Sequence, residues 1–212
     1  MNPPSPSVTR YAQAAMPTRA GRLGVVVYRE SGSPAGSEPK EHLAIVAGEL
    51  AALAAPAGGD GEPVLARVHS ECWTGETLGS LKCDCREQLD RALEAITAAG
   101  RGVVVYLRQE GRGIGLGNKI RAYALQEQGA DTVEANEQLG FAADLRSYEL
   151  AAEILRDLGV RSVALMTNNP DKVEGLERAG VQVARRVPHW GAAQEHNADY
   201  LEVKKTKLGH KV

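Results

Sequence analysis

The chain has 212 residues, 43% of them hydrophobic, which is long enough for one full hydrophobic core and a small appended lobe. A formal net charge of −2 and an aromatic content of 4% offer neither a broad basic surface nor many base-stacking side chains, which argues against nucleic-acid binding. No apolar run reaches the length of a membrane span, and prolines stand where a secretory signal has its apolar segment, so we expect a cytoplasmic protein that binds no membrane.

The first sixty residues predict a tail followed by a small β-rich lobe. Residues 1–20 contain several prolines and no acidic residue, which favours a disordered tail. Residues 23–29 and 43–48 are short apolar runs typical of strands, separated by a turn-rich segment. Residues 55–63 predict a second exposed loop, and residues 64–70 a further strand.

Helices and apolar strands alternate after this lobe. The apolar stripe from Leu89 to Ile96 has helical spacing and should end at Gly100, and residues 102–107 follow as a buried strand. The stripe from Leu150 to Leu158 predicts a second amphipathic helix.

Ser147 is the expected cap of this second helix. Residues 160–167 predict the next strand, the sequence NNP should open a short helix, and residues 181–188 predict the last strand. This order predicts an α/β fold, in which a mixed sheet is packed with helices and joined to the N-terminal lobe. We expect residues 21–212 to form a single catalytic domain.

All three cysteines of the chain, Cys72, Cys83 and Cys85, lie within fourteen residues. Three small buried side chains are one interpretation, and a disulfide is a weaker one because the count is odd and close neighbours would strain the bond. Clustering favours a thiolate metal site instead. Three protein ligands leave tetrahedral zinc one open position, as in catalytic sites, whereas a fourth ligand from His69 or Glu71 would make the site structural.

A glycine-rich segment, RQEGRGIGLGNKIRAY, follows the strand expected at residues 102–107. Its glycine spacing fits neither the dinucleotide fingerprint nor the phosphate-loop pattern. Close backbone approach and four cationic residues could still form an anion cradle at a helix start, although a flexible solvated loop is an equal alternative for the segment alone. A nearby metal site favours a phosphate-bearing substrate. The cationic residues are Arg108, Arg112, Lys119 and Arg121.

Four ordered motifs, RVHSECWTGETLGSLKCDCREQL, RQEGRGIGLGNKIRAYALQEQGADTVEAN, LGFAADLRSY and LMTNNPDKV, together resemble GTP cyclohydrolase II, an enzyme of riboflavin biosynthesis. The resemblance implies hydrolysis of GTP to formate, pyrophosphate and 2,5-diamino-6-ribosylamino-4(3H)-pyrimidinone 5′-phosphate. It also implies one Zn²⁺ per chain on Cys72, Cys83 and Cys85. Mg²⁺ is expected with the triphosphate of GTP, and the family implies a homodimer.

The resemblance assigns further roles. Asp144 would be the proton acceptor, Arg146 the nucleophile towards the α-phosphorus, and Tyr123 would assist ring opening. From the residues alone, Asp144 and Arg146 could equally be a surface ion pair, and Arg146 is better described as a phosphate clamp because a guanidinium stays protonated. Residues expected to contact GTP are Arg67, Val68, His69, Ser70, Glu71, Gln88, Glu110, Gly111, Arg112, Thr132, Thr167 and Lys172.

Glu110 has the acceptor oxygens to bind the N1–H and amino hydrogens of guanine, although a solvated loop charge is the simpler interpretation. The chain departs from the family pattern near the cysteines, where Trp73, Lys82 and Arg86 replace an aliphatic residue, an arginine and a glycine. Two alternatives remain open. One is a paralogue that acts on GTP in another purine-derived pathway or stops at a formylated pyrimidine, although Tyr123, associated with full hydrolysis, is present. The other is a zinc-stabilised RNA-binding or regulatory module, which the composition disfavours.

Overall fold

The computed structural model describes residues 7–32, 36–54, 62–142 and 144–191. Seven strands form one mixed sheet in the order β1-β2-β3-β5-β4-β6-β7. Pairing is antiparallel from β1 through β2 and β3 to β5, and parallel from β5 through β4 and β6 to β7. The strands are β1 (Val8–Thr18), β2 (Gly21–Glu30), β3 (Glu41–Ala47), β4 (Val64–Ser70), β5 (Gly102–Leu107), β6 (Ser162–Met166) and β7 (Gln182–Val187).

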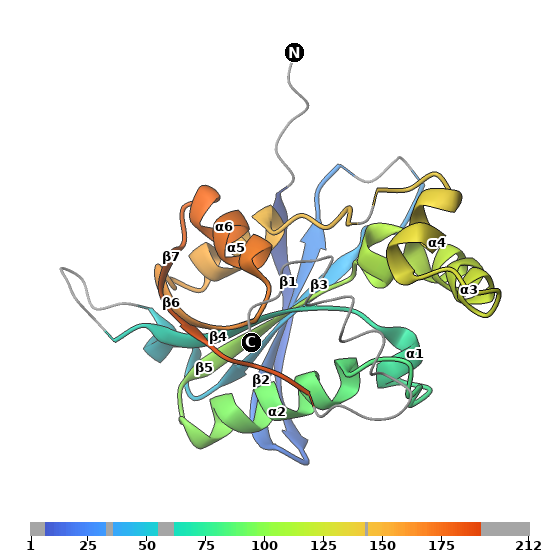
Figure 1. The fold of residues 1–212 in the computed structure, drawn as a ribbon. Helices are drawn as coiled ribbons and strands as arrows, with labels where there is room; N and C mark the ends of the chain where they lie inside the picture. The colour runs from blue at the N-terminus through green and yellow to red at the C-terminus, as the bar shows by residue number, and fades with distance from the viewer. Residues whose placement is uncertain (1–6, 33–35, 55–61, 143, 192–212) are drawn as a thin grey trace.

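Helices pack on both faces of the sheet, which confirms the predicted α/β class. Helices α5 and α6 cover one face, α2 covers the other, and α1, α3 and α4 lie together at one end (Figure 1). The helices are α1 (Trp73–Glu76), α2 (Cys85–Ala98), α3 (Gly115–Gln126), α4 (Thr132–Gln138), α5 (Glu149–Asp157) and α6 (Pro170–Arg178), with short 3₁₀ turns η1 (Leu50–Leu53) and η2 (Glu110–Gly113).

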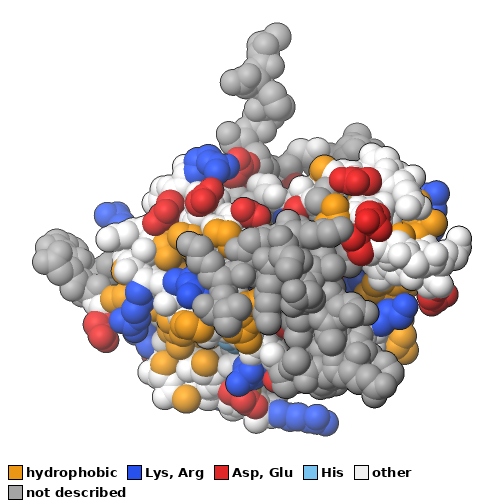
Figure 2. All heavy atoms as spheres, viewed as in Figure 1, with side chains coloured by type: hydrophobic (Ala, Val, Ile, Leu, Met, Phe, Trp, Pro, Cys, Tyr) orange, Lys and Arg blue, Asp and Glu red, His pale blue; other side chains and the backbone are white. Residues whose placement is uncertain are grey.

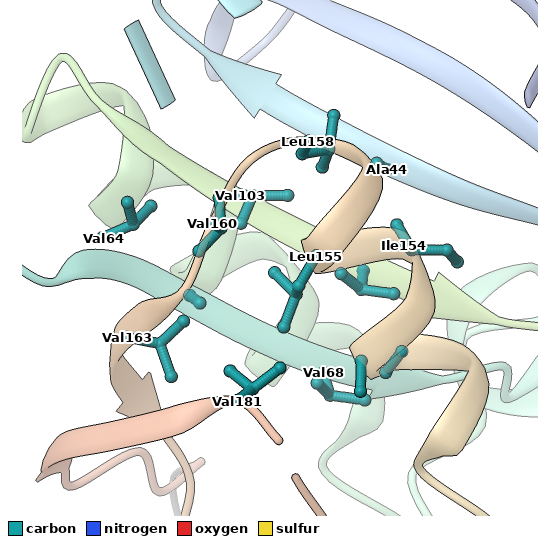
Figure 3. Packing of buried hydrophobic residues seen from close by; sticks show 14 of the residues in the cluster. Ala44, Val64, Val68, Val103, Ile154, Leu155, Leu158, Val160, Val163 and Val181 are labelled. Atoms are coloured by element: carbon teal, nitrogen blue, oxygen red, sulfur yellow. The ribbon is translucent and has the colours of Figure 1, made fainter. Parts of the chain in front are cut away.

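The larger part of the core lies between the sheet and helices α5 and α6. Figure 3 shows Leu155 of α5 directed at the valines of β4 and β5, with Val163 of β6 beside them. Leu155 and Val163 are both fully buried. Burial of such a side chain contributes about 1.5–3 kcal/mol, so this layer fixes the positions of β4 and β6, whose ends carry the site described below.

A smaller core lies on the opposite face, under α2. Ala92 and Ile96 of α2 pack against Leu23, Val104 and Met166 from three strands of the sheet. Gly102 at the start of β5 permits this close approach, because a Cβ there would lie only 2.6 Å from the Ile96 Cγ2 atom. The predicted stripe from Leu89 to Ile96 is therefore the buried face of a helix, as expected.

The prediction of a disordered tail is wrong for residues 8–18, which form the edge strand β1. This strand pairs with β2 from Val8 opposite Glu30 to Thr18 opposite Gly21. Prolines obscured it in the sequence, but Pro17 lies near the strand end, where a missing N–H is tolerated. The N-terminal strands form the expected small β-rich lobe, and pairing of β3 with β5 joins them to the main sheet. Residues 1–6 of the predicted tail lie outside the described residues.

Local capping agrees with the sequence to within one residue. The N-cap of α5 is Tyr148 rather than the predicted Ser147, whose Oγ instead accepts a hydrogen bond from Glu149 N at 3.3 Å. The short helix predicted after NNP is α6, where the Asn169 side chain accepts from Asp171 N at 2.9 Å. Asn169 is therefore the N-cap of α6.

The helices of the described segments include none long and apolar enough to cross a membrane. On the face seen in Figure 2, acidic side chains gather over α4 and over α5 and α6, with Lys and Arg interspersed among the coloured residues rather than forming one basic surface. This distribution agrees with the near-neutral net charge of −2.

Candidate active site

A cleft opens at the carboxyl ends of the parallel strands β4, β5 and β6, with about 1050 Å³ of empty space that includes its open mouth. This end of an α/β sheet is the usual place for a ligand. Most of the predicted site residues line it, although they come from five separate segments of the chain. They are Arg67, His69, Ser70, Glu71, Cys72, Cys83, Cys85, Gln88, Glu110, Gly111, Arg112, Tyr123, Arg146, Thr167 and Lys172.

The three cysteines form a compact cluster on one wall of the cleft. Their sulfur atoms all lie within 4.8 Å of one another, and Cys72 Sγ is 3.7 Å from Cys83 Sγ. Tetrahedral zinc with Zn–S bonds of about 2.3 Å needs sulfurs roughly 3.8 Å apart, so the spacing fits this metal. Gly75 leaves the necessary room, because a Cβ there would lie 2.9 Å from Cys83 Sγ. In the described ranges, the side chains grouped closely enough to hold a metal are these three alone.

Neither proposed fourth ligand joins this cluster. His69 Nε2 lies 2.7 Å from Glu76 Oε1, and Glu71 accepts a hydrogen bond from Arg108 Nε at 2.8 Å. Among the described residues, a metal on the cysteines would therefore have three ligands, which is the arrangement of catalytic zinc sites.

The cysteine pKa values show how tightly the three sulfurs interact. Hydrogen bonds from Cys83 and Cys85 lower the pKa of the Cys72 thiol far below its usual range, and Lys119 adds to the effect. The same contacts with Cys72 raise the pKa of Cys83 to about 11 and hold the pKa of Cys85 well above its usual value. The three thiols therefore do not ionise independently, and binding of a divalent cation would favour ionisation of all three.

Two buried carboxylates hold the backbone that carries Cys72. Glu76 accepts hydrogen bonds from Cys72 N at 3.0 Å, from His69 Nε2 at 2.7 Å and from the Tyr106 hydroxyl at 2.6 Å. The Glu76 side chain is 10% exposed. Because β4 supplies His69 and β5 supplies Tyr106, this carboxylate fixes the metal-binding turn to the ends of both strands.

The second carboxylate is Glu110, which begins the glycine-rich turn η2. It accepts from Trp73 N at 2.6 Å, from Gly111 N at 2.7 Å and from Lys119 Nζ at 2.8 Å. These contacts use three of the roughly four acceptor positions of a carboxylate. Glu110 lines the cleft, and its carboxylate has about one acceptor position left. Its contact with guanine stays a prediction.

The glycine-rich segment is a turn in left-handed conformation, followed by α3. Gly111 and Arg112 have φ values of 62° and 61°, and a non-glycine residue in this region carries about 1–2 kcal/mol of strain. The Arg112 carbonyl accepts from Leu145 N at 3.0 Å, which joins the turn to the segment that carries Arg146. Arg112 Nη1 is buried without a hydrogen-bond partner in the described part of the chain, so it is available to an anion.

The other cations of the expected anion cradle have partners within the chain. Arg108 pairs with Glu71, and Arg121 Nη1 donates to Asn118 Oδ1 at 3.1 Å. Lys119 lines the cleft but contacts Cys72 and Glu110 rather than open space. Of the four cations, Arg112 has the geometry expected of the cradle.

Asp144 and Arg146 form a partly buried ion pair. Arg146 Nε lies 2.9 and 3.0 Å from the two carboxylate oxygens of Asp144, and Arg146 N donates to Asp144 Oδ1 at 2.9 Å. Burial pushes the pKa of Asp144 upwards, but the hydrogen bonds and charge of Arg146 outweigh it and hold the pKa below its usual value. Arg146 lines the main cleft, whereas Asp144 lines an adjoining hollow between α5 and α6.

A buried polar floor lies beneath the cleft. Arg67 donates to Met166 O at 2.7 Å and to Gln88 Oε1 at 2.5 Å, and burial lowers the pKa of its guanidinium to about 10. Lys172 Nζ donates to Val68 O at 2.8 Å. Val68 therefore contributes its carbonyl to this floor, while its side chain packs in the core.

Tyr123 lines the cleft from α3 rather than being an ordinary core residue. Lys82 Nζ lies 5.0 Å from the centre of its ring and Lys119 Nζ lies 5.8 Å away. Burial raises the pKa of its phenol to about 12, so the hydroxyl keeps its proton at neutral pH and can donate. Thr132, also expected at the site, is the first residue of α4.

Several lining residues were not foreseen. Asn168 Oδ1 accepts from His189 N at 3.0 Å, and His189 Nε2 lies 2.8 Å from Gln88 O, so the segment after β7 closes one side of the cleft. Asn168 belongs to the NNP motif that predicted α6, which was a usable signal. His189 stands in none of the four motifs, and Glu76 lies within the first of them but had no role assigned, because the partners of both are set by the fold.

Comparison with known proteins shows the family of the chain. A sequence model of the GTP cyclohydrolase II family matches residues 9–188. The chain is 52% identical to GTP cyclohydrolase-2 of Hahella chejuensis over 96% of this chain and 92% of that protein. It is also 52% identical to GTP cyclohydrolase-2 of Aeromonas hydrophila, over 96% and 97%. Identity is 54% to the riboflavin biosynthesis protein RibBA of Bacillus subtilis, of which the chain spans 48%.

Proposed function

Because the chain belongs to the GTP cyclohydrolase II family, we propose that it catalyses the zinc-dependent opening of the guanine imidazole ring of GTP, with release of formate and pyrophosphate. The product would be 2,5-diamino-6-ribosylamino-4(3H)-pyrimidinone 5′-phosphate, in the first step of riboflavin biosynthesis. The proposal is carried by one observation: a cluster of three cysteines lies in the same cleft as a buried arginine nitrogen that has no hydrogen-bond partner among the described residues.

The metal end of the cleft suits ring opening. Cys72, Cys83 and Cys85 would hold one Zn²⁺ per chain, and a bound zinc would supply a Lewis acid that activates water near C8 of guanine. The protonated phenol of Tyr123 lines the same cleft and can donate a hydrogen bond to the ring-opened nucleotide. The proposal also assigns His69, Glu71 and Glu110, which line the same cleft, to contacts with the nucleotide.

We call the part of the cleft that carries Arg112 and Arg146 the phosphate end, and its residues suit phosphate chemistry. Arg112 and Arg146 would neutralise the charge that develops when the bond between the α-phosphorus and pyrophosphate breaks. The family resemblance further assigns the attack on the α-phosphorus to Arg146. In that step a nitrogen–phosphorus bond forms, pyrophosphate leaves, and the guanidinium proton passes to Asp144, whose oxygens lie 2.9 and 3.0 Å from Arg146 Nε.

The same ion pair favours the protonated guanidinium, because the Asp144 carboxylate stabilises positive charge beside it. Charge neutralisation by Arg146 is therefore the part of the proposal with the strongest physical support, and the covalent step rests on the family resemblance. In addition, Mg²⁺ would accompany the triphosphate of GTP. The chain would act as a cytoplasmic homodimer. The described strands and helices would form one catalytic domain.

The direct test is to incubate the protein with GTP, Zn²⁺ and Mg²⁺ and to identify every product by mass. The proposal expects formate, pyrophosphate and the deformylated pyrimidine in equal amounts. A formylated pyrimidine as the end product would favour the alternative of a paralogue that stops after partial hydrolysis. Intact GTP after prolonged incubation with a zinc-loaded protein would contradict the proposed function altogether.

A further inference from the structure

Lys119 is a buried cation on α3 whose position the proposed chemistry does not explain. The residue is 9% exposed, and its Nζ lies 3.1 Å from Cys72 Sγ and 2.8 Å from Glu110 Oε1. Buried lysines are rare unless they are paired, so the burial of Lys119 beside these two groups needs an explanation. Cys72 is 47 residues from Lys119 in the sequence and Glu110 is 9 residues away, so the fold brings the sulfur to the ammonium.

The charge of the proposed metal site gives that reason. Three thiolates and one divalent cation sum to a net charge of about −1 in a largely buried cluster, where an uncompensated charge is costly. The Glu110 carboxylate beside the cluster adds a second negative charge. The ammonium of Lys119 lies between the two and contacts both, and hydrogen bonds to an ionised acceptor are the strong class.

The contacts also form a closed ring through the metal-binding turn. Cys72 Sγ accepts from Lys119, Lys119 donates to Glu110, and Glu110 accepts from the backbone N of Trp73, the residue that follows Cys72. Movement of the Cys72 sulfur away from the cluster would therefore break contacts in α3 and in η2 as well.

We propose that Lys119 is a positioning residue of the metal site, which offsets the negative charge of the three thiolates and locks Cys72 to Glu110. This inference rests on the proposed zinc site. It assigns Lys119 no contact with the reacting atoms. Groups that contact metal ligands and fix their orientation commonly change metal affinity by tenfold to a hundredfold when they are removed.

The test compares Lys119→Met with Lys82→Met. Methionine keeps an unbranched side chain of similar length and removes the charge and the donors. Lys82 is a suitable control because it lies near the same tyrosine ring, has a side chain that is 44% exposed, and is 3.5 Å from Glu127 Oε1. Both variants and the wild type would be loaded with Zn²⁺ and titrated with a competing chelator.

Lys119→Met should bind Zn²⁺ more weakly than the wild type by about tenfold to a hundredfold, and Lys82→Met should match the wild type within about twofold. A second readout separates charge from packing. With Co²⁺ in place of Zn²⁺, loss of the hydrogen bond to Cys72 Sγ should shift the sulfur-to-metal absorption band to longer wavelength in Lys119→Met alone. If that variant does not fold, as judged by circular dichroism, Lys119→Gln replaces it.

A folded Lys119 variant with wild-type zinc affinity and an unshifted cobalt band would overturn the inference while leaving the proposed function intact. Equal weakening in Lys82→Met would overturn it too, because the effect would then be one of general charge. A wild type that retains neither Zn²⁺ nor Co²⁺ would overturn the proposed metal site itself, and this inference with it.

Discussion

The metal end and the phosphate end of the cleft differ in how many of their polar groups already have partners within the protein. At the metal end, Cys72 is 6% exposed, and the amides of Cys72 and Trp73 donate to the carboxylates of Glu76 and Glu110. At the phosphate end, Arg112 sits in a strained turn with a nitrogen that has no partner among the described residues. The first end is assembled by the protein, whereas the second leaves charge for a ligand to satisfy.

This difference predicts that the two ends will fail in different ways. Substitutions of the groups that hold the metal-binding turn should weaken metal binding and the folded state together, because the same hydrogen bonds serve both. Substitutions at the phosphate end should impair phosphate chemistry and leave the fold intact. The predictions below sharpen this contrast, beginning with the largest effect.

Arg146→Ala should slow pyrophosphate release by about a hundredfold or more with zinc still bound, because a preorganised charge at the transferring phosphoryl group is lost. Pyrophosphate release and zinc content would be measured on the same preparation. Arg121→Ala is the control and should stay within about twofold, since Arg121 is exposed and bonds only Asn118 in the contacts described above. Loss of zinc in Arg146→Ala would contradict the independence of the two ends.

Glu76→Gln should lower zinc affinity by about tenfold, and should also destabilise the fold. The amide would place donor hydrogens against some of the three donors that the carboxylate now accepts from Cys72, His69 and Tyr106. Chelator competition and urea unfolding would check the two effects. The control is Glu127→Gln, whose side chain is 71% exposed. Wild-type zinc affinity in Glu76→Gln would show that the metal-binding turn needs no such support.

Tyr123→Phe should change the product rather than the overall folding or zinc content. We expect a formylated pyrimidine to accumulate, because the phenol donor that assists the second hydrolytic step is removed while the cysteines are untouched. Product masses would be compared with those from Tyr11→Phe, where the ring is 59% exposed on β1. A wild-type product profile in Tyr123→Phe would remove this tyrosine from the mechanism.

The smallest expected effect is a pH dependence of stability from His189 beside the cleft. Burial lowers the pKa of His189 to about 4, so the folded state holds this ring neutral. The stability that this neutral ring contributes is therefore complete above the unfolded pKa of about 6.5 and is lost as pH falls towards 4. Between pH 6.5 and 5.5 the free energy of unfolding should fall by about 1 kcal/mol for this reason. Urea unfolding of His189→Gln should show a shallower loss over this interval than the wild type. Identical slopes would contradict the assignment.

The sequence predicted the elements whose signals are local. The run at residues 102–107 is apolar throughout because β5 is buried on both faces, and the cysteines are close enough along the chain to indicate a common site. Strand β1 was missed because it is almost wholly exposed and has no apolar alternation to detect. Its pairing with β2 is a property of the hairpin rather than of its own residues.

The contacts that organise the site were beyond sequence reasoning for a related reason. Lys119 was expected to bind an anion with the other cations of its segment, but the fold places it against a sulfur atom 47 residues away. Glu110 was expected to face the substrate, yet three donors from the chain surround it. Asp144 and Arg146 stand two positions apart in the sequence, which allowed a surface ion pair as one interpretation, and their partial burial came from packing.

The most direct test of the account is to measure formate and pyrophosphate separately in Cys83→Ser and Arg146→Ala. The account predicts that folded Cys83→Ser loses zinc and formate release but keeps some cleavage of the GTP phosphates, most simply to GMP. It predicts the reverse pattern in Arg146→Ala, which should keep its zinc and lose pyrophosphate release. Formate production by zinc-free Cys83→Ser, or full zinc occupancy in that variant, would contradict the assignment of ring opening to the three-cysteine end of the cleft.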